Sequence, residues 1–210
     1  MATKPWILFD IGGVFALADD GNWQRRFSAH LRERAGLDVD TFGERVDAAD
    51  LPRLDLEQGV ETEYWRRLGD ALGFDTATRV DVRAEFWDAY CGTPNAELLA
   101  YARSLPAHVG RAALSNSSDG AREEEERRFG LSSVVDLISY SHEIGVAKPD
   151  PAAYATALSR MSAEPGQVLF IDDHQESVDG AASAGIRSHL HTDNATTIAA
   201  IEEFLAPYSA

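Results

Sequence analysis

The sequence has one cysteine, Cys91, and few basic residues, and both shortages exclude classes of protein. A single cysteine cannot build a disulfide framework, which favours a reducing compartment. The 19 basic residues are outnumbered by 35 acidic ones, and they form no cluster that would meet the phosphates of a nucleic acid. No apolar run approaches the ~18 residues of a membrane helix, and no leader-like segment precedes the first apolar run. We therefore expect a cytoplasmic protein that binds neither nucleic acid nor a membrane.

Internal repeats and low-complexity segments are absent as well, so we expect one large domain or a core with a smaller insertion. The 210 residues are 44% apolar, which is enough for a sizeable core. The apolar run Trp6–Phe9 predicts a buried strand, and the segment from about Trp23 to Tyr90 shows a helical pattern with no convincing strand. The helices expected in it are Trp23–Ala35, Thr41–Ala49, Thr62–Leu72 and Thr78–Ala89.

Beyond Gly92 the pattern changes to strands that alternate with helices. Thr93-Pro94 is expected to cap and open a helix that ends at Ser104, because proline is favoured at the first helical position. The later strands are expected at Arg111–Ser115, Val134–Ser139, Val168–Ile171 and Arg187–His191. The later helices are expected at Asp119–Phe129, from Asp150-Pro151 onward, at Glu176–Ala184 and at Thr196–Leu205.

This order of elements predicts an α/β fold with a doubly wound parallel sheet, because alternating strands and helices form right-handed crossovers on both faces. The helical stretch lies between the first strand and the others, so we expect it to be an all-α cap inserted into the core. The expected core comprises residues 1–16 and 92–210, and the expected cap comprises residues 17–91.

Polar side chains follow three of the expected strands. Asp10 ends the first, Ser115 and Asn116 end the second, and Asp172 and Asp173 end the third. The carboxyl ends of parallel strands form the ligand-binding edge of such a sheet, so these groups are expected to meet there. Three carboxylates in one cleft repel one another unless a cation neutralises them, and Mg²⁺ prefers oxygen ligands of this kind. The sequence therefore predicts a magnesium site that also receives a phosphate.

Lys148 and two glycines complete this expected site. Lys148 would supply a positive charge to the phosphate and to Asp10, and Ser115 would donate a hydrogen bond to a phosphoryl oxygen. Gly12 and Gly13 would let backbone N–H groups approach an anion closely. Each feature alone is commonly a turn, a helix cap or a solvated side chain, but their order after successive strands favours one shared site.

Four segments in this order resemble the motifs of the haloacid dehalogenase-like (HAD) superfamily, in the branch with a helical cap after the first strand. They are Phe9–Val14, Leu114–Ser117, Lys148–Tyr154, and Phe170–Asp173 followed by Gly180–Ile186. The cap stretch Leu54–Trp65 also resembles that of members similar to sugar phosphatases, although the match is looser.

The resemblance implies a Mg²⁺-dependent phosphatase that acts on a small phosphorylated metabolite through an aspartyl-phosphate. Asp10 would be the nucleophile, with Ser115 and Lys148 as the other catalytic residues. The implied metal ligands are Asp10, the carbonyl of Gly12, Asp172 and Asp173. The implied substrate-binding residues are Gly12, Gly13, Ser115, Asn116 and Lys148.

One expected acid is missing, because most phosphatases of this family carry a second aspartate where this chain has Gly12. That aspartate protonates the leaving oxygen and later activates water, and such help is typically worth ~10²–10⁴-fold in rate. Asp19, Asp20 and His174 are candidates to replace it, although a solvated turn and a structural histidine are the plainer interpretations.

The missing acid leaves several functions open. The first is a phosphatase with good leaving groups or an acid from elsewhere, as in relatives that also carry Asp-x-Gly. The second is a dehalogenase-like hydrolase that attacks carbon without Mg²⁺, against which the pair Asp172-Asp173 counts. The third is a binding or accessory module with weak or no catalysis, and the fourth is other HAD chemistry, such as phosphonate or phosphoryl-transfer reactions.

Two further features receive plain interpretations. The run Glu123–Glu126 is expected on an exposed helix face, with ion pairs Glu123–Arg127 and Glu124–Arg128 at helical spacing. Aromatic residues of the cap are expected mostly to pack its helices, with one or two lining the substrate pocket. They are Trp23, Phe27, Trp65, Phe86, Trp87 and Tyr90.

Overall fold

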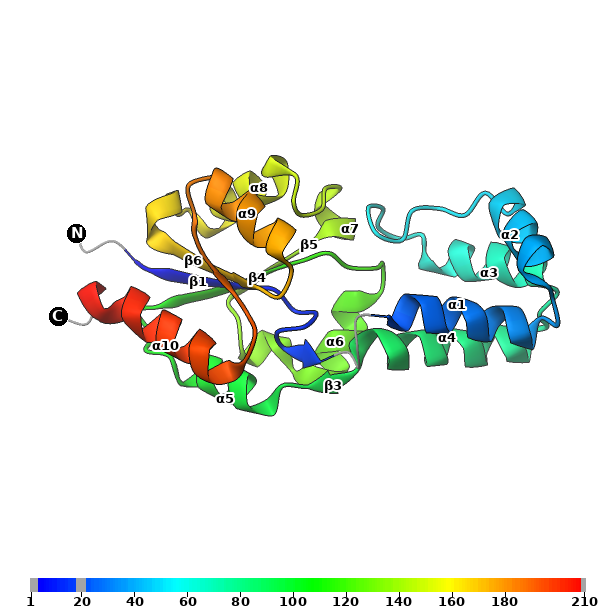
Figure 1. The fold of residues 1–210 in the computed structure, drawn as a ribbon, viewed down its shortest axis with the longest axis horizontal. Helices are drawn as coiled ribbons and strands as arrows, with labels where there is room; N and C mark the ends of the chain where they lie inside the picture. Colours follow the sequence, from blue (N-terminus) through cyan, green and yellow to red (C-terminus); the bar gives the residue numbers. More distant parts are fainter. Residues whose placement is uncertain (1–3, 18–21, 209–210) are drawn as a thin grey trace.

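The computed structural model describes residues 4–17 and 22–208, and its centre is a five-stranded parallel sheet (Figure 1). The sheet order is β5-β4-β1-β6-β7, with every neighbouring pair parallel. The strands are β1 (Trp6–Phe9), β4 (Gly110–Ser115), β5 (Leu137–Tyr140), β6 (Val168–Asp172) and β7 (Arg187–Leu190). The central position of β1 places its carboxyl end between those of β4 and β6.

Both faces of this sheet are covered, because its strands are apolar on both sides. In β1, Ile7 and Phe9 pack on one face and Trp6 and Leu8 on the other, and all four are buried. The first face is covered by α5 (Ala96–Ser104), α6 (Ala121–Phe129) and α10 (Asn194–Leu205). The second is covered by α8 (Pro151–Met161) and α9 (Gln175–Ser183). The expected doubly wound α/β core is confirmed.

Four helices extend beyond the carboxyl edge of the sheet (Figure 1). They are α1 (Trp23–Arg34), α2 (Val39–Ala48), α3 (Glu61–Leu72) and α4 (Thr76–Cys91). Their core is aromatic: the ring of Phe86 lies 5.2 Å from that of Trp65 and 5.0 Å from that of Trp87, centroid to centroid. Aromatic rings bury large apolar areas, so their packing stabilises this layer of four helices.

Hydrogen bonds from the core also hold the helical layer in place. The carboxylate of Asp119, just before α6, accepts hydrogen bonds from the amides of Val60 and Glu61 at 2.6 and 2.7 Å. A core residue thereby caps the first turn of α3, whose amides have no partner within the helix. The hydroxyl of Ser141 donates to the carbonyl of Asp55 at 2.7 Å. These bonds fix the loop before α3 against the core.

The structure corrects the expected helix start at Thr93-Pro94. These residues form a short strand, β3 (Thr93–Pro94), antiparallel to β2 (Ala16–Leu17), and the helix begins at Ala96 with Asn95 as its cap. The Asn95 side chain accepts from the amide of Leu98 and donates to the carbonyl of Val14 at 2.9 Å. The pairing partner lies about 77 positions away along the chain, so local patterns cannot indicate it.

Two element boundaries also differ from expectation. The apolar residues Val134 and Val135 are buried after a 3₁₀ turn (Leu131–Ser133), and the strand starts only at Leu137. Helix α6 begins at Ala121 rather than at Asp119, because Asp119 is occupied as the cap of α3. The remaining short elements are α7 (Ser141–Ile144) and 3₁₀ turns at Pro165–Gln167 and Ala206–Tyr208.

Among the residues that the structure describes, no helix combines the length and the apolar character that crossing a bilayer requires.

Candidate active site

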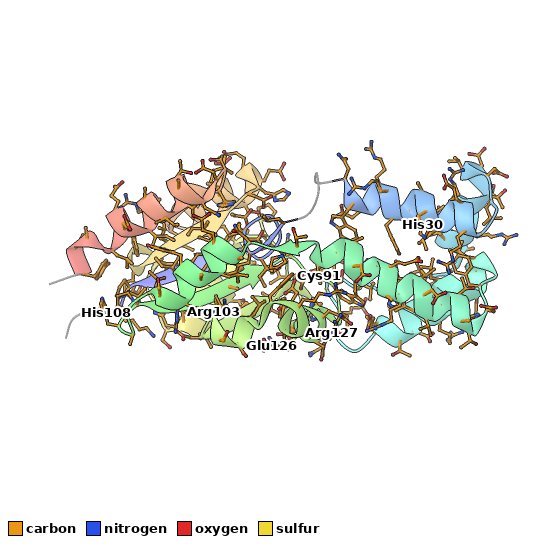
Figure 2. All side chains as sticks on the ribbon, turned by 90° about the horizontal axis from the view of Figure 1, so that it is seen from below. His30, Cys91, Arg103, His108, Glu126 and Arg127 are labelled. Carbon is orange, nitrogen blue, oxygen red and sulfur yellow. The ribbon has the colours of Figure 1, made fainter. Side chains whose placement is uncertain are left out.

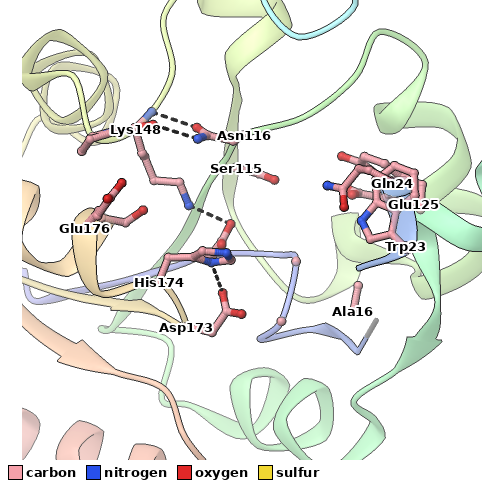
Figure 3. Close-up of a pocket in the computed structure, with 16 residues that line it drawn as sticks. Ala16, Trp23, Gln24, Ser115, Asn116, Glu125, Lys148, Asp173, His174 and Glu176 are labelled. Atoms are coloured by element: carbon pink, nitrogen blue, oxygen red, sulfur yellow. Dashed lines mark hydrogen bonds and ion pairs between the residues drawn. The ribbon is translucent and has the colours of Figure 1, made fainter. Parts of the chain in front are cut away.

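Polar residues from the ends of β1, β4 and β6 line one cavity, as the sequence predicts, except that Asp172 is fully buried and is not among the lining residues. The cavity has a volume of about 360 Å³ and is lined by Asp10, Ser115, Lys148 and Asp173, among others (Figure 3). The register explains the meeting, because Phe9 pairs with Ala113 of β4 and with Ile171 of β6. The residues that follow these positions therefore come together at the carboxyl edge.

Lys148 is buried between two carboxylates. Its Nζ lies 2.8 Å from Oδ1 of Asp10 and 2.6 Å from Oδ2 of Asp172, and its side chain is only 2% exposed. Asp172 is fully buried, and its other oxygen accepts the amide of His174 at 2.8 Å. Buried charges persist when they are paired and hydrogen-bonded. One ammonium thus bridges the ends of β1 and β6.

Asn116 positions the backbone that carries this lysine. Its side-chain nitrogen donates to the carbonyl of Lys148 at 2.8 Å, and its side-chain oxygen accepts the amide of Lys148 at 2.8 Å. From the sequence, Asn116 was predicted to bind substrate. The structure gives its amide a different partner, so Asn116 holds the loop from which Lys148 enters the cavity.

The pKa values of the paired groups follow from burial and charge. Burial raises the pKa of Asp10 to about 7; the Lys148 ammonium lowers it and the Asp172 charge raises it. Burial alone lowers the pKa of Lys148, but the Asp10 and Asp172 carboxylates raise it above its ordinary value. The ammonium therefore stays charged, and a further cation beside Asp10 would favour its carboxylate form.

Asp173 lies beside Gly13, which leaves room for it. Gly13 has φ of +72°, and a Cβ at this position would overlap the Asp173 carboxylate. The amide of Gly13 donates to the carbonyl of Ala16 at 2.8 Å, so it is not directed at an anion as expected. The role of Gly13 in the structure is steric: because it has no side chain, the carboxylate of Asp173 can pack against the turn that follows β1.

Replacing Gly13 by alanine is expected to lower Mg²⁺ affinity by about 10- to 100-fold, because the methyl group displaces Asp173. The left-handed backbone adds strain of about 1–2 kcal/mol. Gly36→Ala is a matched control, since Gly36 has φ of +65° and nothing within 4 Å of its Cβ position. Calorimetric titration with Mg²⁺ should detect weaker binding only in Gly13→Ala, and equal affinities in both variants would contradict this role.

Gly12 lines the cavity without a side chain, and a Cβ built on it meets nothing within 4 Å. A side chain could therefore start at this position, but Gly12 supplies no carboxylic acid there. Asp19 and Asp20, two expected replacements, lie outside the described residues. The third, His174, has a side chain 74% exposed, and its Nδ1 lies 2.8 Å from Asp173. His174 therefore sits among the acids rather than opposite them.

Trp23 and Gln24 from α1 and Glu125 from α6 line the side of the cavity opposite Lys148 and Asp173 (Figure 3), and Tyr90 from α4 lines the cavity as well. The rings of Trp23 and Tyr90 pack edge to face, 5.6 Å apart, so two cap aromatics line the pocket as the sequence predicts. Glu125 is 2% exposed, which contradicts the expectation that the whole run Glu123–Glu126 is solvated. Its Oε2 accepts the hydroxyl of Tyr140 at 2.6 Å.

Among the described residues, one of the two ion pairs expected on this helix is present and the other is replaced. Glu124 lies 3.6 Å from Arg128, which is the expected pair, and Arg127 bonds Glu124 at 2.5 Å rather than Glu123. Glu126 and Arg127 lie at the outer edge of α6 (Figure 2). A signal for Glu125 was present in the sequence, because Ala121, Glu125 and Phe129 share one helical face and are all buried.

The fold is thus a parallel α/β sheet whose carboxyl edge holds an acid cluster and one buried lysine beside a helical layer. The family model "haloacid dehalogenase-like hydrolase" matches residues 5–185. The chain belongs to this family of hydrolases.

Known proteins similar to this chain include phosphatases and dehalogenases. A phosphatase from Mycobacterium tuberculosis is 27% identical over 190 residues, which are 88% of this chain and 85% of the relative. An (S)-2-haloacid dehalogenase from a Pseudomonas species is 26% identical over 142 residues, covering 62% of this chain and 60% of the relative. A HAD family enzyme from Bacteroides thetaiotaomicron, solved with magnesium and inorganic phosphate, is 17% identical, with a TM-score of 0.66. That likeness covers 92% of this chain and 98% of the other.

Proposed function

We propose that this protein is a Mg²⁺-dependent phosphatase that releases phosphate from a small phosphorylated metabolite. The observation that carries the proposal is the buried ammonium of Lys148 between Asp10 and Asp172, with Asp173 admitted by Gly13. The three carboxylates carry more negative charge than the single ammonium neutralises. A bound Mg²⁺ would balance this excess and allow the cavity to accept a phosphate. The phosphatase relative from Mycobacterium tuberculosis supports the same activity.

The residues present fit a magnesium ion. Single ligand atoms of Asp10, Asp172, Asp173 and His174 lie within 4.8 Å of one another, and three of the four are hard carboxylate oxygens. The three atoms nearest to the Cβ position of Gly13 all belong to the Asp173 carboxylate, so the absence of a side chain at Gly13 leaves space for this ligand. Asp10, Asp172, Asp173 and the carbonyl of Gly12 would hold the ion. When bound, it supplies charge neutralisation and polarises a phosphoryl oxygen.

Asp10 is the nucleophile of this mechanism. Its Oδ1 accepts the amide of Ile11 at 2.7 Å and contacts Lys148, which fixes the carboxylate and leaves Oδ2 to attack phosphorus. The Asp10–phosphorus bond forms as the bond to the leaving oxygen breaks. Lys148 keeps its charge and stabilises the oxygens of the transferring group, while Ser115 donates its hydroxyl hydrogen to them. Water then releases phosphate and restores Asp10.

The haloacid dehalogenase relative makes carbon hydrolysis the second candidate, because that chemistry also uses a nucleophile but needs no leaving-group acid. The acid pair Asp172-Asp173 and the fit to Mg²⁺ count against it. A binding or accessory role is the third, and it rests on the missing side chain at Gly12.

A panel of phosphate esters, assayed with and without Mg²⁺, separates these functions. We expect phosphate release that requires Mg²⁺ and is lost in Asp10→Asn. No release from any ester, activated aryl phosphates included, would overturn the phosphatase. Metal-independent halide release from haloacids would establish the dehalogenase, and binding of Mg²⁺ and phosphate without turnover of either substrate class would establish the accessory module.

A further inference from the structure

Glu125 is a buried acid of α6 that the mechanism above does not use. Its carboxyl is 2% exposed, yet it borders the same cavity as Asp10 and lies across it from Lys148 and Asp173 (Figure 3). Tyr140 holds Oε2 at 2.6 Å, while Oε1 has no hydrogen-bond partner among the described residues. A buried acid with one oxygen fixed and the other free beside a ligand cavity is suited to proton transfer.

We propose that Glu125 transfers the proton at the leaving-group side of Asp10, in place of the aspartate that Gly12 lacks. This inference rests on the proposed phosphatase function. Glu125 lies with Trp23 and Gln24 on the side of the cavity opposite Lys148 and Asp173 (Figure 3), where the part of a substrate beyond its phosphoryl group would lie. Asp10 contacts Lys148 on the other side, so a leaving oxygen in line with Asp10 would point toward Glu125.

The step balances with Glu125 alone. As the Asp10–phosphorus bond forms and the bond from phosphorus to the leaving oxygen breaks, the Glu125 proton passes to that oxygen and releases an alcohol. Glu125 is then a carboxylate. It accepts a proton from the water that attacks phosphorus, while the bond to Asp10 breaks and phosphate leaves. Both groups return to their starting states.

The surroundings keep the acid protonated at neutral pH. Burial raises the pKa of Glu125 to about 8; the Tyr140 hydroxyl lowers it, the Asp10 charge raises it and Arg122 lowers it. The other ionisable groups that face Glu125, Tyr90 and Cys91 on α4, stay neutral there. Burial raises the pKa of the Cys91 thiol to about 12 and that of Tyr90 well above its usual range.

The test compares alkyl and aryl phosphates in Glu125→Gln, which keeps the shape and the bond from Tyr140 but has no proton to transfer. An alkoxide leaving group needs protonation, whereas a nitrophenolate does not. We expect formation of the phospho-enzyme from an alkyl phosphate to slow by about 10²–10⁴-fold. The first-turnover burst of nitrophenol from an aryl phosphate should stay unchanged. Glu123→Gln, an exposed neighbour on the same helix, should behave as wild type.

Equal losses on both esters, or no loss on either, would overturn the role of Glu125 while leaving the phosphatase function intact. A wild type that releases no phosphate from any ester would instead remove the function on which the inference rests.

A second variant keeps the proposal falsifiable if Glu125→Gln does not fold. Turnover of alkyl phosphates should fall as pH rises through about 8, because the acid form is then lost. Tyr140→Phe removes a hydrogen bond that favours the charged form of Glu125. We expect this limb of the pH profile to move to higher pH in Tyr140→Phe. An unmoved limb would overturn the assignment.

Discussion

Replacing Lys148 by methionine is expected to abolish measurable phosphatase turnover and to destabilise the protein by about 3–5 kcal/mol, because it leaves Asp10 and Asp172 buried without their shared cation. Methionine has a similar length and packs well in apolar surroundings, so lost volume contributes little. Urea unfolding and the ester assay measure the two effects. Mg²⁺ should recover part of the stability, since a divalent cation neutralises the same carboxylates.

The chain provides a matched control, since its only other lysine is Lys4. The Lys4 side chain is 46% exposed, and its Nζ lies 3.9 Å from Asp136. A surface ion pair of this kind contributes about 0–1 kcal/mol. Lys4→Met should therefore change neither stability nor turnover appreciably. Similar unfolding midpoints for the two methionine variants would contradict the view that Lys148 joins the ends of β1 and β6.

Gly12→Asp is expected to restore alkyl-phosphate turnover to Glu125→Gln by about 10²-fold or more, because it supplies a carboxylic acid beside the cavity. The Cβ position of Gly12 has no atom within 4 Å, so the side chain can be accommodated. The measurement is steady-state kinetics of the double variant on alkyl and aryl phosphates. Gly12→Asn in the same background has the same size but no proton to transfer, and it should restore nothing.

Gly12→Asp in the otherwise unchanged protein separates the two possible origins of the proton. With Glu125 in place, the added aspartate duplicates an existing function and should change alkyl-phosphate turnover little. A large gain there would show that the natural protein has no proton donor, and that result would contradict the part assigned to Glu125.

The sheet and the residues at its edge were predictable from sequence because their signals are local. An apolar strand followed at once by Asp10, Ser115 or Asp172 needs only strand order to place all three at one edge. The doubly wound core, the helical layer and membership of the HAD family followed from the same segments.

The parts that escaped prediction depend on contacts between distant segments. Thr93 and Pro94 carry a helix-start pattern, but pairing with Ala16 and Leu17 places them in a ribbon. The side-chain amide of Asn116 was expected to bind substrate, but in the folded chain it is hydrogen-bonded to the backbone of Lys148, which lies 32 residues further along. No local pattern contains these partners.

The burial of Glu125 beside the cavity was not predicted for another reason. Its neighbours in a run of four glutamates made a solvated face the plain interpretation, although it recurs at four-residue spacing with Ala121 and Phe129. Glu125 is the member of the run that lines the cavity, and its helical spacing is the feature that distinguishes it from its neighbours.

The central claim is that Asp10 becomes covalently phosphorylated, and acid-quenched mass spectrometry tests it most directly. Enzyme mixed with an aryl phosphate and Mg²⁺ should gain the mass of one phosphoryl group on the peptide that contains Asp10. The gain should be absent without Mg²⁺ and in Asp10→Asn. Rapid phosphate release with no phosphoryl group on Asp10 at any quench time, or the same adduct in Asp10→Asn, would contradict the account.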